Sequence, residues 1–446
     1  MRRAGVHALR LALAHRAPST TNQCCSATAG INAPHLLHAT SSSSQELPEQ
    51  ACSTSYSIQM APAFSRRHYW TSNSSLHTAV AQPQGGSISD QALDDATSIS
   101  HVDPYAVVQP EVKAISERLR HSVSSTVPVL KQAAEYFFRK GVEGKRLRPT
   151  LVMLMASALA HTPPASEYHG VDLRPASEPT HELRRRQQRI AEIAELIHVA
   201  SLLHDDVIDE ASTRRGILSL NATVGNKVSI LSGDFLLARA SVTLGALRNT
   251  EIVELMSQIL EYLVSGEIMQ MTATQEQTLD MDHYLQKTYC KTASLMANCM
   301  RAVAVLEGLS PEVCSTAWSY GRHLGLAFQI VDDVLDLTGS ASILGKPALN
   351  DLKSGVATAP VLFAAEQQPE LCTLIRRKFK STGDLDRAVQ LINQSDGIQR
   401  ARDLAKHHCL MAAEMVHGLP KPASDHAILA RQALIVMTHK LLDRKK

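Results

Sequence analysis

The sequence lacks the features of several common protein classes. Its 446 residues carry 45 Lys plus Arg against 43 Asp plus Glu, so it has no broad cationic surface of the kind that binds nucleic acid. The eight cysteines form no CxxC pair, which argues against a structural zinc site. The longest uninterrupted apolar run, 151–155, is far shorter than the roughly 20 residues of a membrane span. Anion binding must therefore be local, and membrane contact is at most peripheral.

Glycine-rich phosphate loops are also missing. Neither GxxxxGK[ST] nor GxGxxG occurs, so any bound phosphate would be held by metal ions and cationic side chains instead. No internal repeat with a period of 20 to 50 residues is present, which excludes a solenoid or a propeller.

The first hundred residues differ in composition from the rest. No acidic residue precedes Glu46 and no lysine precedes Lys113, while arginines punctuate an apolar stretch near the start. This composition predicts an organelle transit peptide, and the short basic amphipathic pattern favours a mitochondrial over a plastid address. The alternative is a serine-rich flexible tail with no targeting role. Either way, we assign residues 1–100 to a transit peptide and flexible segment, and residues 101–446 to one catalytic domain.

The remaining chain has the periodicity of α-helices. Apolar residues recur three and four positions apart, as in Ile190, Ile193, Ala194 and Ile197, and few stretches alternate in the manner of strands. This pattern predicts an all-α fold, a single large helical bundle. Four prolines interrupt it between 161 and 189, where we expect a long surface loop.

Two acidic clusters of the same pattern each end an apolar helical run. The first contains Asp205, Asp206 and Asp209, and the second contains Asp332, Asp333 and Asp336. Residues four apart share a helix face, so each cluster presents a pair of carboxylates that repel one another. Oxygen ligands with no His or Cys partner at ligand spacing suit Mg²⁺, which binds one or two carboxylates plus water and substrate phosphate. The alternative is a solvated acidic helix end, which the repetition of the cluster disfavours.

Cationic residues alternate with the acidic clusters along the chain. Lys145 and Arg148 precede the first cluster, and Arg214 and Arg215 follow it by five residues. His198 lies seven residues before Asp205, on nearly the same helical stripe. Arginine offers a planar fork for two phosphate oxygens and lysine a mobile point charge. Each signal alone is weak, since a His in an apolar run is more often a core residue, but their order points to diphosphate ligands.

Taken together, these motifs resemble the trans-polyprenyl diphosphate synthase family, over about residues 103–446. The sequence between the motifs is most similar to that of the long-chain solanesyl or decaprenyl diphosphate synthases of ubiquinone side-chain synthesis. The resemblance implies an isoprenoid-synthase bundle around a central cavity. The motifs that carry it, in family order, are Gly144-Lys145-Arg146-Leu147-Arg148-Pro149, Leu203-His204-Asp205-Asp206-Val207-Ile208-Asp209, Arg214-Arg215-Gly216, Lys291-Thr292, Phe328-Gln329-Ile330-Val331-Asp332-Asp333-Val334-Leu335-Asp336 and Gly345-Lys346-Pro347.

The resemblance also implies a role for each matching residue. Isopentenyl diphosphate would be held by Lys145, Arg148, His198 and Arg215. The allylic diphosphate (geranyl, farnesyl or geranylgeranyl) would be held by Arg214, Lys291, Thr292, Gln329 and Lys346. The metal site would comprise Asp205, Asp209, Asp332 and Asp336, the first three as direct Mg²⁺ ligands and Asp336, with Asp206 and Asp333, acting through water or hydrogen bonds. Catalysis would depend chiefly on Asp205, Asp209, Asp332, Lys291 and Arg214. The implied assembly is a homodimer, or a heteromer with a second synthase subunit.

Product length is predicted from the residues that precede the first cluster. Ala200 and Ser201 lie five and four positions before Asp205, and Ala194 lies eleven before it. A substrate tail anchored at the metal site would run back along this helix, where small side chains leave the channel open. We therefore expect a long product rather than a geranylgeranyl-type one. The alternative is that the small residues only allow close helix packing.

Three other functions were weighed against this one. A metal phosphohydrolase could use the His204-Asp205 pair, but it would leave the second acidic cluster unexplained. A terpene cyclase would share the first cluster but is expected to carry an Asn/Ser/Glu-type second motif. A non-catalytic subunit is disfavoured because both acidic motifs are complete.

Overall fold

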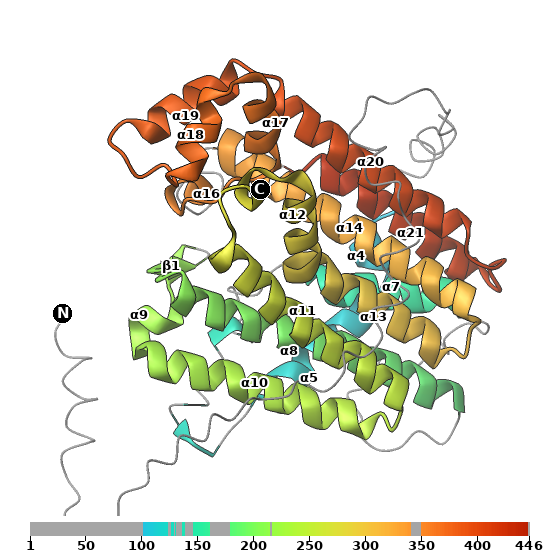
Figure 1. Cartoon of the computed structure of the whole chain (residues 1–446). Coiled ribbons are helices and arrows are strands. Elements are labelled where there is room, and N and C mark those ends of the chain that lie inside the picture. Colours follow the sequence, from blue (N-terminus) through green and yellow to red (C-terminus); the bar gives the residue numbers. More distant parts are fainter. Residues whose placement is uncertain are drawn as a thin grey trace, which may run out of the picture. The chain divides into compact units, whose positions relative to one another are not determined.

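Helices make up nearly all the regular structure of the described chain (Figure 1). The computed structural model describes residues 101–123, 126–128, 130, 136–138, 146–160, 179–214, 216–339 and 349–444. Its elements are α4 (Pro104–Val107), α5 (Gln109–Ser122), η1 (Tyr136–Phe138), α7 (Leu147–Leu159), α8 (Pro179–Ile208), β1 (Thr213–Arg214), β2 (Ile217–Leu218), α9 (Leu220–Val224), α10 (Asn226–Ala246), α11 (Thr250–Thr272), η2 (Gln277–Leu279), α12 (Met281–Thr288), η3 (Tyr289–Ala293), α13 (Ser294–Leu306), α14 (Pro311–Thr338), α16 (Asn350–Lys353), α17 (Ala359–Gln367), α18 (Glu370–Arg376), α19 (Asp384–Asn393), α20 (Gly397–His417) and α21 (Asp425–Leu442). The all-α prediction is confirmed.

Two long helices carry the acidic clusters. Helix α8 has 30 residues and α14 has 28, so each is about 40 to 45 Å long. The loop expected over 161–189 is wrong in its second part, because α8 already begins at Pro179. Proline is compatible with the first turn of a helix, where its missing N–H would have no partner anyway. Residues 161–178 lie outside the described part of the chain.

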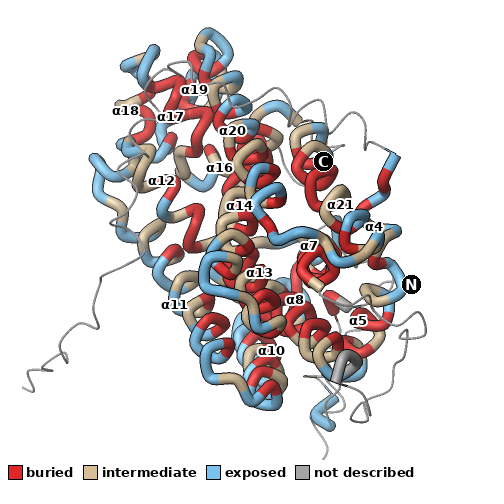
Figure 2. Tube along the Cα trace, turned by 90° about the vertical axis from the view of Figure 1, so that its right-hand side faces the viewer, coloured by how far each residue is buried: buried red, intermediate tan, exposed pale blue. Residues whose placement is uncertain are grey.

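Helices α7 and α13 are equally deeply buried, and each has only two of its 13 residues not buried. Helix α13 positions the π turn before it. It packs between α14 and α8, and Figure 2 shows the buried residues gathered on these facing helices. Two glycines bring α14 close to the chain leading into α13. A Cβ at Gly321 would lie 2.7 Å from Ala297 Cα, and one at Gly325 would lie 2.5 Å from Ala293 Cα. Any larger residue would push these helices apart.

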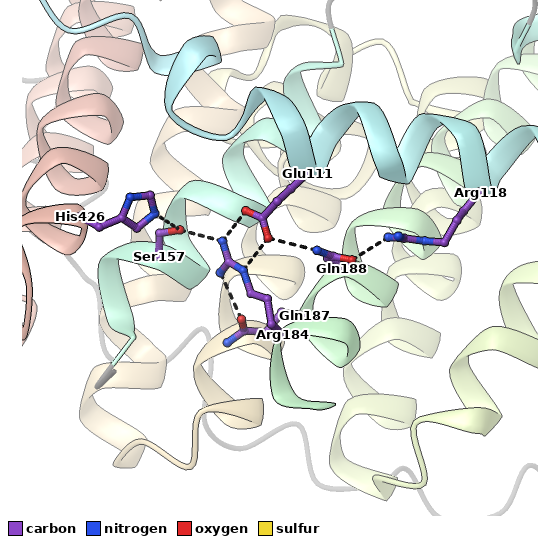
Figure 3. Close-up of polar contacts among 7 residues, drawn as sticks. All are labelled: Glu111, Arg118, Ser157, Arg184, Gln187, Gln188 and His426. Atoms are coloured by element: carbon purple, nitrogen blue, oxygen red, sulfur yellow. Dashed lines mark hydrogen bonds and ion pairs between the residues drawn. The ribbon is translucent and has the colours of Figure 1, made fainter. Parts of the chain in front are cut away.

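A buried polar network joins the first helices of the domain to α8 and α21 (Figure 3). Arg184 of α8 donates to both carboxylate oxygens of Glu111 on α5, at 2.7 and 2.6 Å, and to Ser157 of α7 at 2.8 Å. Further along, Arg118 donates to Gln188 at 2.8 Å. Every charge in this network faces an opposite charge or a hydrogen-bonding group, as buried charges require.

The β1–β2 hairpin is the one sheet among the described residues. It is antiparallel, with Thr213 opposite Leu218 and Arg214 opposite Ile217. Gly216 in its turn has φ +79°, a conformation that favours glycine. The hairpin follows α8 directly and turns Arg214 back towards the end of that helix.

Helix α10 exposes much of its apolar surface. By length and composition it could cross a membrane, and only 33% of its most apolar stretch is buried. The length of uninterrupted apolar runs does not reveal this helix, because Ser232, Gly233 and Asp234 interrupt its apolar stretch. Exposed apolar positions continue on α11, which includes Val264 and Met271.

Candidate active site

The first acidic cluster occupies the C-terminal end of α8. The N–H of Asp209 donates to the carbonyl of Asp205 at 2.8 Å, so the helical turn extends to Asp209. The pKa of the Asp205 carboxyl is raised to about 6, chiefly by burial; the charges of Glu267 and Asp209 also raise it, and those of Lys291 and Arg214 lower it. The pKa of Asp209 is also raised, chiefly by burial. The negative end of the helix dipole disfavours anions here, so the cluster is not a simple stabilising helix end.

Asp206 differs from its neighbour Asp205. Its side chain is fully buried, and its Oδ1 accepts hydrogen bonds from Arg214 Nε at 2.7 Å and from the terminal NH2 nitrogen at 2.6 Å. Its Oδ2 is buried with no hydrogen-bond partner among the described residues. Asn221 of α9 donates to the Asp206 carbonyl at 3.0 Å. Asp206 therefore anchors Arg214 beside the acidic cluster.

In the second cluster, Asp333 is the hydrogen-bonded member. Its two carboxylate oxygens accept from Tyr284 Oη at 2.6 Å and Gln329 Nε2 at 2.8 Å. Gln329 in turn accepts from Thr292 Oγ1 at 3.0 Å. Burial raises the pKa of the Asp333 carboxyl, and that of Tyr284, which donates to it. This chain of contacts connects Thr292 to the second cluster.

The other two carboxylates of the second cluster have different surroundings. Asp336 is buried, and its Oδ2 accepts the backbone N–H of Asp351 at the start of α16, at 3.0 Å. Asp332 is partly exposed and pairs with Arg444 near the C-terminus, at 3.1 Å. The Arg444 guanidinium also lies 4.7 Å from the centre of the Phe328 ring.

Lys291 and Thr292 lie on η3, a π-helical turn between α12 and α13. Such turns are rare and frequently occur at functional sites. The Lys291 Nζ lies 2.5 Å from Glu267 Oε2 and 3.3 Å from Gln270 Oε1, both on α11. Because its charge also lowers the pKa of Asp205 and Asp209, it acts on the first cluster, while Thr292 contacts the second through Gln329. The π turn therefore connects the two acidic clusters.

The residues predicted for the isopentenyl diphosphate site are only partly described. Arg148 and Ala194 both line a small pocket between α7, α8 and α13. His198 is half-buried one helical turn beyond Ala194. Ala200 is fully buried, and Ser201 Oγ donates to the His198 carbonyl at 2.9 Å. Lys145, Arg215 and Lys346 lie outside the described residues.

Several site residues were missed in the sequence. Glu267 and Gln270 contact Lys291, Tyr284 contacts Asp333, and Arg444 contacts Asp332. One signal could have revealed the first pair: Glu267 and Gln270 are polar residues three apart in a largely apolar helix, next to Gly266. Tyr284 and Arg444 have no comparable local signal.

Comparisons with known proteins show which family and which solved structures the chain is similar to. The profile of the polyprenyl synthetase family matches residues 127–392. The chain is 47% identical over 371 residues to solanesyl diphosphate synthase 3, chloroplastic/mitochondrial, of Arabidopsis thaliana, covering 82% of this chain and 87% of that protein. It resembles the apo form of an Arabidopsis medium/long-chain length prenyl pyrophosphate synthase (TM-score 0.62, 44% identity, 77% of this chain and 100% of the other). It also resembles a Caulobacter crescentus polyprenyl synthase complexed with calcium and isoprenyl diphosphate (TM-score 0.65, 28% identity, 77% and 97%).

Proposed function

The chain belongs to the polyprenyl synthetase family, and from this premise we propose how its two acidic clusters work. It is a mitochondrial long-chain trans-prenyltransferase, which condenses isopentenyl diphosphate onto an allylic diphosphate. We assign its polyprenyl product to the side chain of ubiquinone. The observation that carries the mechanism is the η3 turn, which puts Lys291 beside Asp205 and Asp209 and joins Thr292 through Gln329 to Asp333.

Mg²⁺ fits the residues of this site. The available ligands are carboxylate oxygens, which Mg²⁺ prefers. Burial and mutual repulsion disfavour the negative charges of Asp205 and Asp209, so a nearby cation would stabilise them. A buried carboxylate oxygen of Asp206 also has no hydrogen-bond partner among the described residues. Asp205, Asp209 and Asp332 would hold the metal. Asp336 would support it indirectly, since it binds the backbone of α16. When bound, the metal would supply positive charge that stabilises the leaving diphosphate.

The chain's own residues orient the substrates. Lys291 and Arg214 donate to the allylic diphosphate as its carbon–oxygen bond breaks, which gives an allylic cation and free diphosphate. The hydroxyl of Thr292 and the amide of Gln329 face the same substrate. The isopentenyl double bond, held by Lys145, Arg148, His198 and Arg215, then attacks the cation. The new carbon–carbon bond forms with loss of a proton, which we assign to the released diphosphate.

The product grows along α8, towards the pocket beside Ala194. The side chains along this path support the assignment: Ala194 lies on the same stripe as Asp205, and the residues around it, Arg148 excepted, are apolar. The experiment uses purified protein, Mg²⁺, labelled isopentenyl diphosphate and each allylic primer in turn. We expect a product well beyond four isoprene units, and a shorter one from Ser201→Phe or Ala200→Tyr. A wild-type product that stops at the geranylgeranyl stage, or unchanged product lengths in both variants, would contradict the long-chain assignment.

We further propose that the protein is a homodimer through α10 and α11. Both helices expose apolar residues, among them Leu231 (62% exposed), Val242 (69%) and Val264 (64%). Asp234 lies exposed in the middle of α10, which would be costly in a bilayer but not at the edge of a protein interface. Leu231→Asp should give a monomer in light scattering, and Ile428→Asp, on an exposed apolar residue of α21, should not. A monomeric wild-type protein, or one that associates only with a second synthase subunit or with vesicles, would contradict the homodimer.

The division at residue 100 is also a proposal. Residues 1–100 would be removed as a transit peptide, and residues 101–446 would form the catalytic domain. All described residues belong to one unit of the chain, which supports a single catalytic domain. Removal of residues 1–100 should leave the specific activity unchanged and abolish mitochondrial import of a fluorescent fusion.

A further inference from the structure

The side chain of Lys291 is held by one helix. Its ammonium group has three N–H donors, and the described residues that accept from it are Glu267, at 2.5 Å, and Gln270, at 3.3 Å. These two residues are three positions apart, so they lie on one face of α11. The Glu267 carboxylate is largely buried, with 14% of its side chain exposed. An ion pair so little exposed to water is stronger than one on the surface.

A close backbone approach at Gly266 places Lys291 against α11. A Cβ on Gly266 would lie 2.7 Å from Lys291 Cγ and 2.9 Å from Cys290 Cβ, so no larger residue fits without moving η3. On the other side, Gly325 allows α14 to approach Ala293 equally closely. The π turn is thus wedged between two glycines, and the direction of the Lys291 side chain is determined by both contacts.

The negative charge of Glu267 disfavours the ionised carboxylates of the first acidic cluster. Its negative charge raises the pKa of both Asp205 and Asp209, which already repel one another. A neutral residue at 267 would remove this repulsion. Lys287 also interacts favourably with this carboxylate, but Lys291 forms the close ion pair with it among the described residues, which indicates that the role of Glu267 is exercised through Lys291.

We propose that Glu267 is the positioning residue for Lys291: together with Gln270 it accepts two of the ammonium N–H groups and directs the third towards the allylic diphosphate. This proposal rests on the assignment of Lys291 to that substrate. Gly266 contributes to the same positioning, since its lack of a side chain allows α11 and η3 to lie this close together. Glu267 itself touches neither substrate.

A double-mutant cycle tests this role. Glu267→Ala should lower kcat of the first condensation roughly 10- to 100-fold while the KM for isopentenyl diphosphate stays within about threefold, because only the lysine's alignment is lost. Glu267→Gln keeps an acceptor oxygen and should recover part of the loss. In the Lys291→Ala background, adding Glu267→Ala should lower kcat by less than about twofold, because the residue through which Glu267 acts is already gone. Glu414→Ala, on an exposed glutamate of α20, is the matched control.

Three outcomes would overturn the proposal. They are a Glu267→Ala enzyme with near-normal kcat, losses that multiply in the double variant, and a rise in the KM for isopentenyl diphosphate as large as the fall in kcat. Gly266→Ala gives an independent check, since it should lower kcat by displacing Lys291 while Glu267 is intact. If instead the wild-type enzyme forms no polyprenyl product with Mg²⁺, the proposed function fails and the cycle has no activity to compare.

Discussion

The two halves of α8 use buried charge in opposite ways. In the N-terminal half, Arg184 and Gln188 form hydrogen bonds with Glu111 (Figure 3). Glu192, in the same half, pairs with Arg118 at 2.5 Å. At the C-terminal end, carboxylates outnumber the cations that face them, and the pKa of Asp205 rises to about 6. One helix therefore carries a neutralised network at one end and an excess of negative charge at the other.

The difference separates a structural role from a functional one. A buried charge with a well-placed partner contributes to a unique arrangement of helices, and it is expensive to break. A cluster of like charges destabilises the fold unless a cation arrives, so its presence indicates a ligand. The N-terminal network should therefore control stability, and the C-terminal cluster should control activity.

The largest expected effect comes from removing one charge of the acidic cluster. Asp205→Asn should lower kcat by roughly 100- to 1,000-fold, because the amide is a poor Mg²⁺ ligand at a site that stabilises the leaving group. The same change should leave the fold intact or raise its melting temperature, which circular dichroism measures on metal-free protein. Asp386→Asn, on an exposed aspartate of α19, is the control. Near-normal activity in Asp205→Asn would show that the C-terminal cluster of α8 does not control activity, contrary to the contrast drawn between the two ends of the helix.

Breaking the N-terminal network should have the opposite effect, with a large loss of stability and little change in kcat. Glu111→Ala leaves the buried guanidinium of Arg184 without its carboxylate, which should lower the free energy of unfolding by about 3 to 5 kcal/mol. The kcat of the folded fraction should change less than about threefold. Denaturant titration measures the first and steady-state kinetics the second, with Glu117→Ala on the same helix as control. A large loss of kcat without loss of stability would mean that the network belongs to the active site.

The smallest effect is a pH dependence. Because the pKa of Asp205 is raised from 3.8 to about 6 in the folded protein, the folded state holds this proton more tightly than the unfolded state. The stability of EDTA-treated protein should therefore fall as the pH rises from about 4 to 7, with Asp209 contributing in the same direction. Asp205→Asn should flatten this fall by about 2 to 3 kcal/mol, and Mg²⁺ at pH 7 should reverse it in the wild type alone. A wild-type profile that rises with pH across this range would contradict the excess of negative charge.

The sequence by itself determined the helices and the two acidic clusters, because both depend on residues within a few turns of one another. The period of apolar residues is local, and so is the spacing of Asp205 and Asp209. The one clear error in the fold, the start of α8, arose from treating Pro179 as a helix breaker, although proline is accepted in a first turn.

Only the tertiary structure decided which charges are paired. Asp205 and Asp206 are adjacent in the sequence, yet Asp206 is buried against Arg214 whereas Asp205 stays partly open, because packing decides which face of α8 meets the hairpin. Lys291, Asp333 and Asp332 each have a partner far away in the chain: Gln270, Tyr284 and Arg444, at 21 to 112 residues. Such contacts depend on how whole helices pack, and no local pattern of side chains specifies that packing.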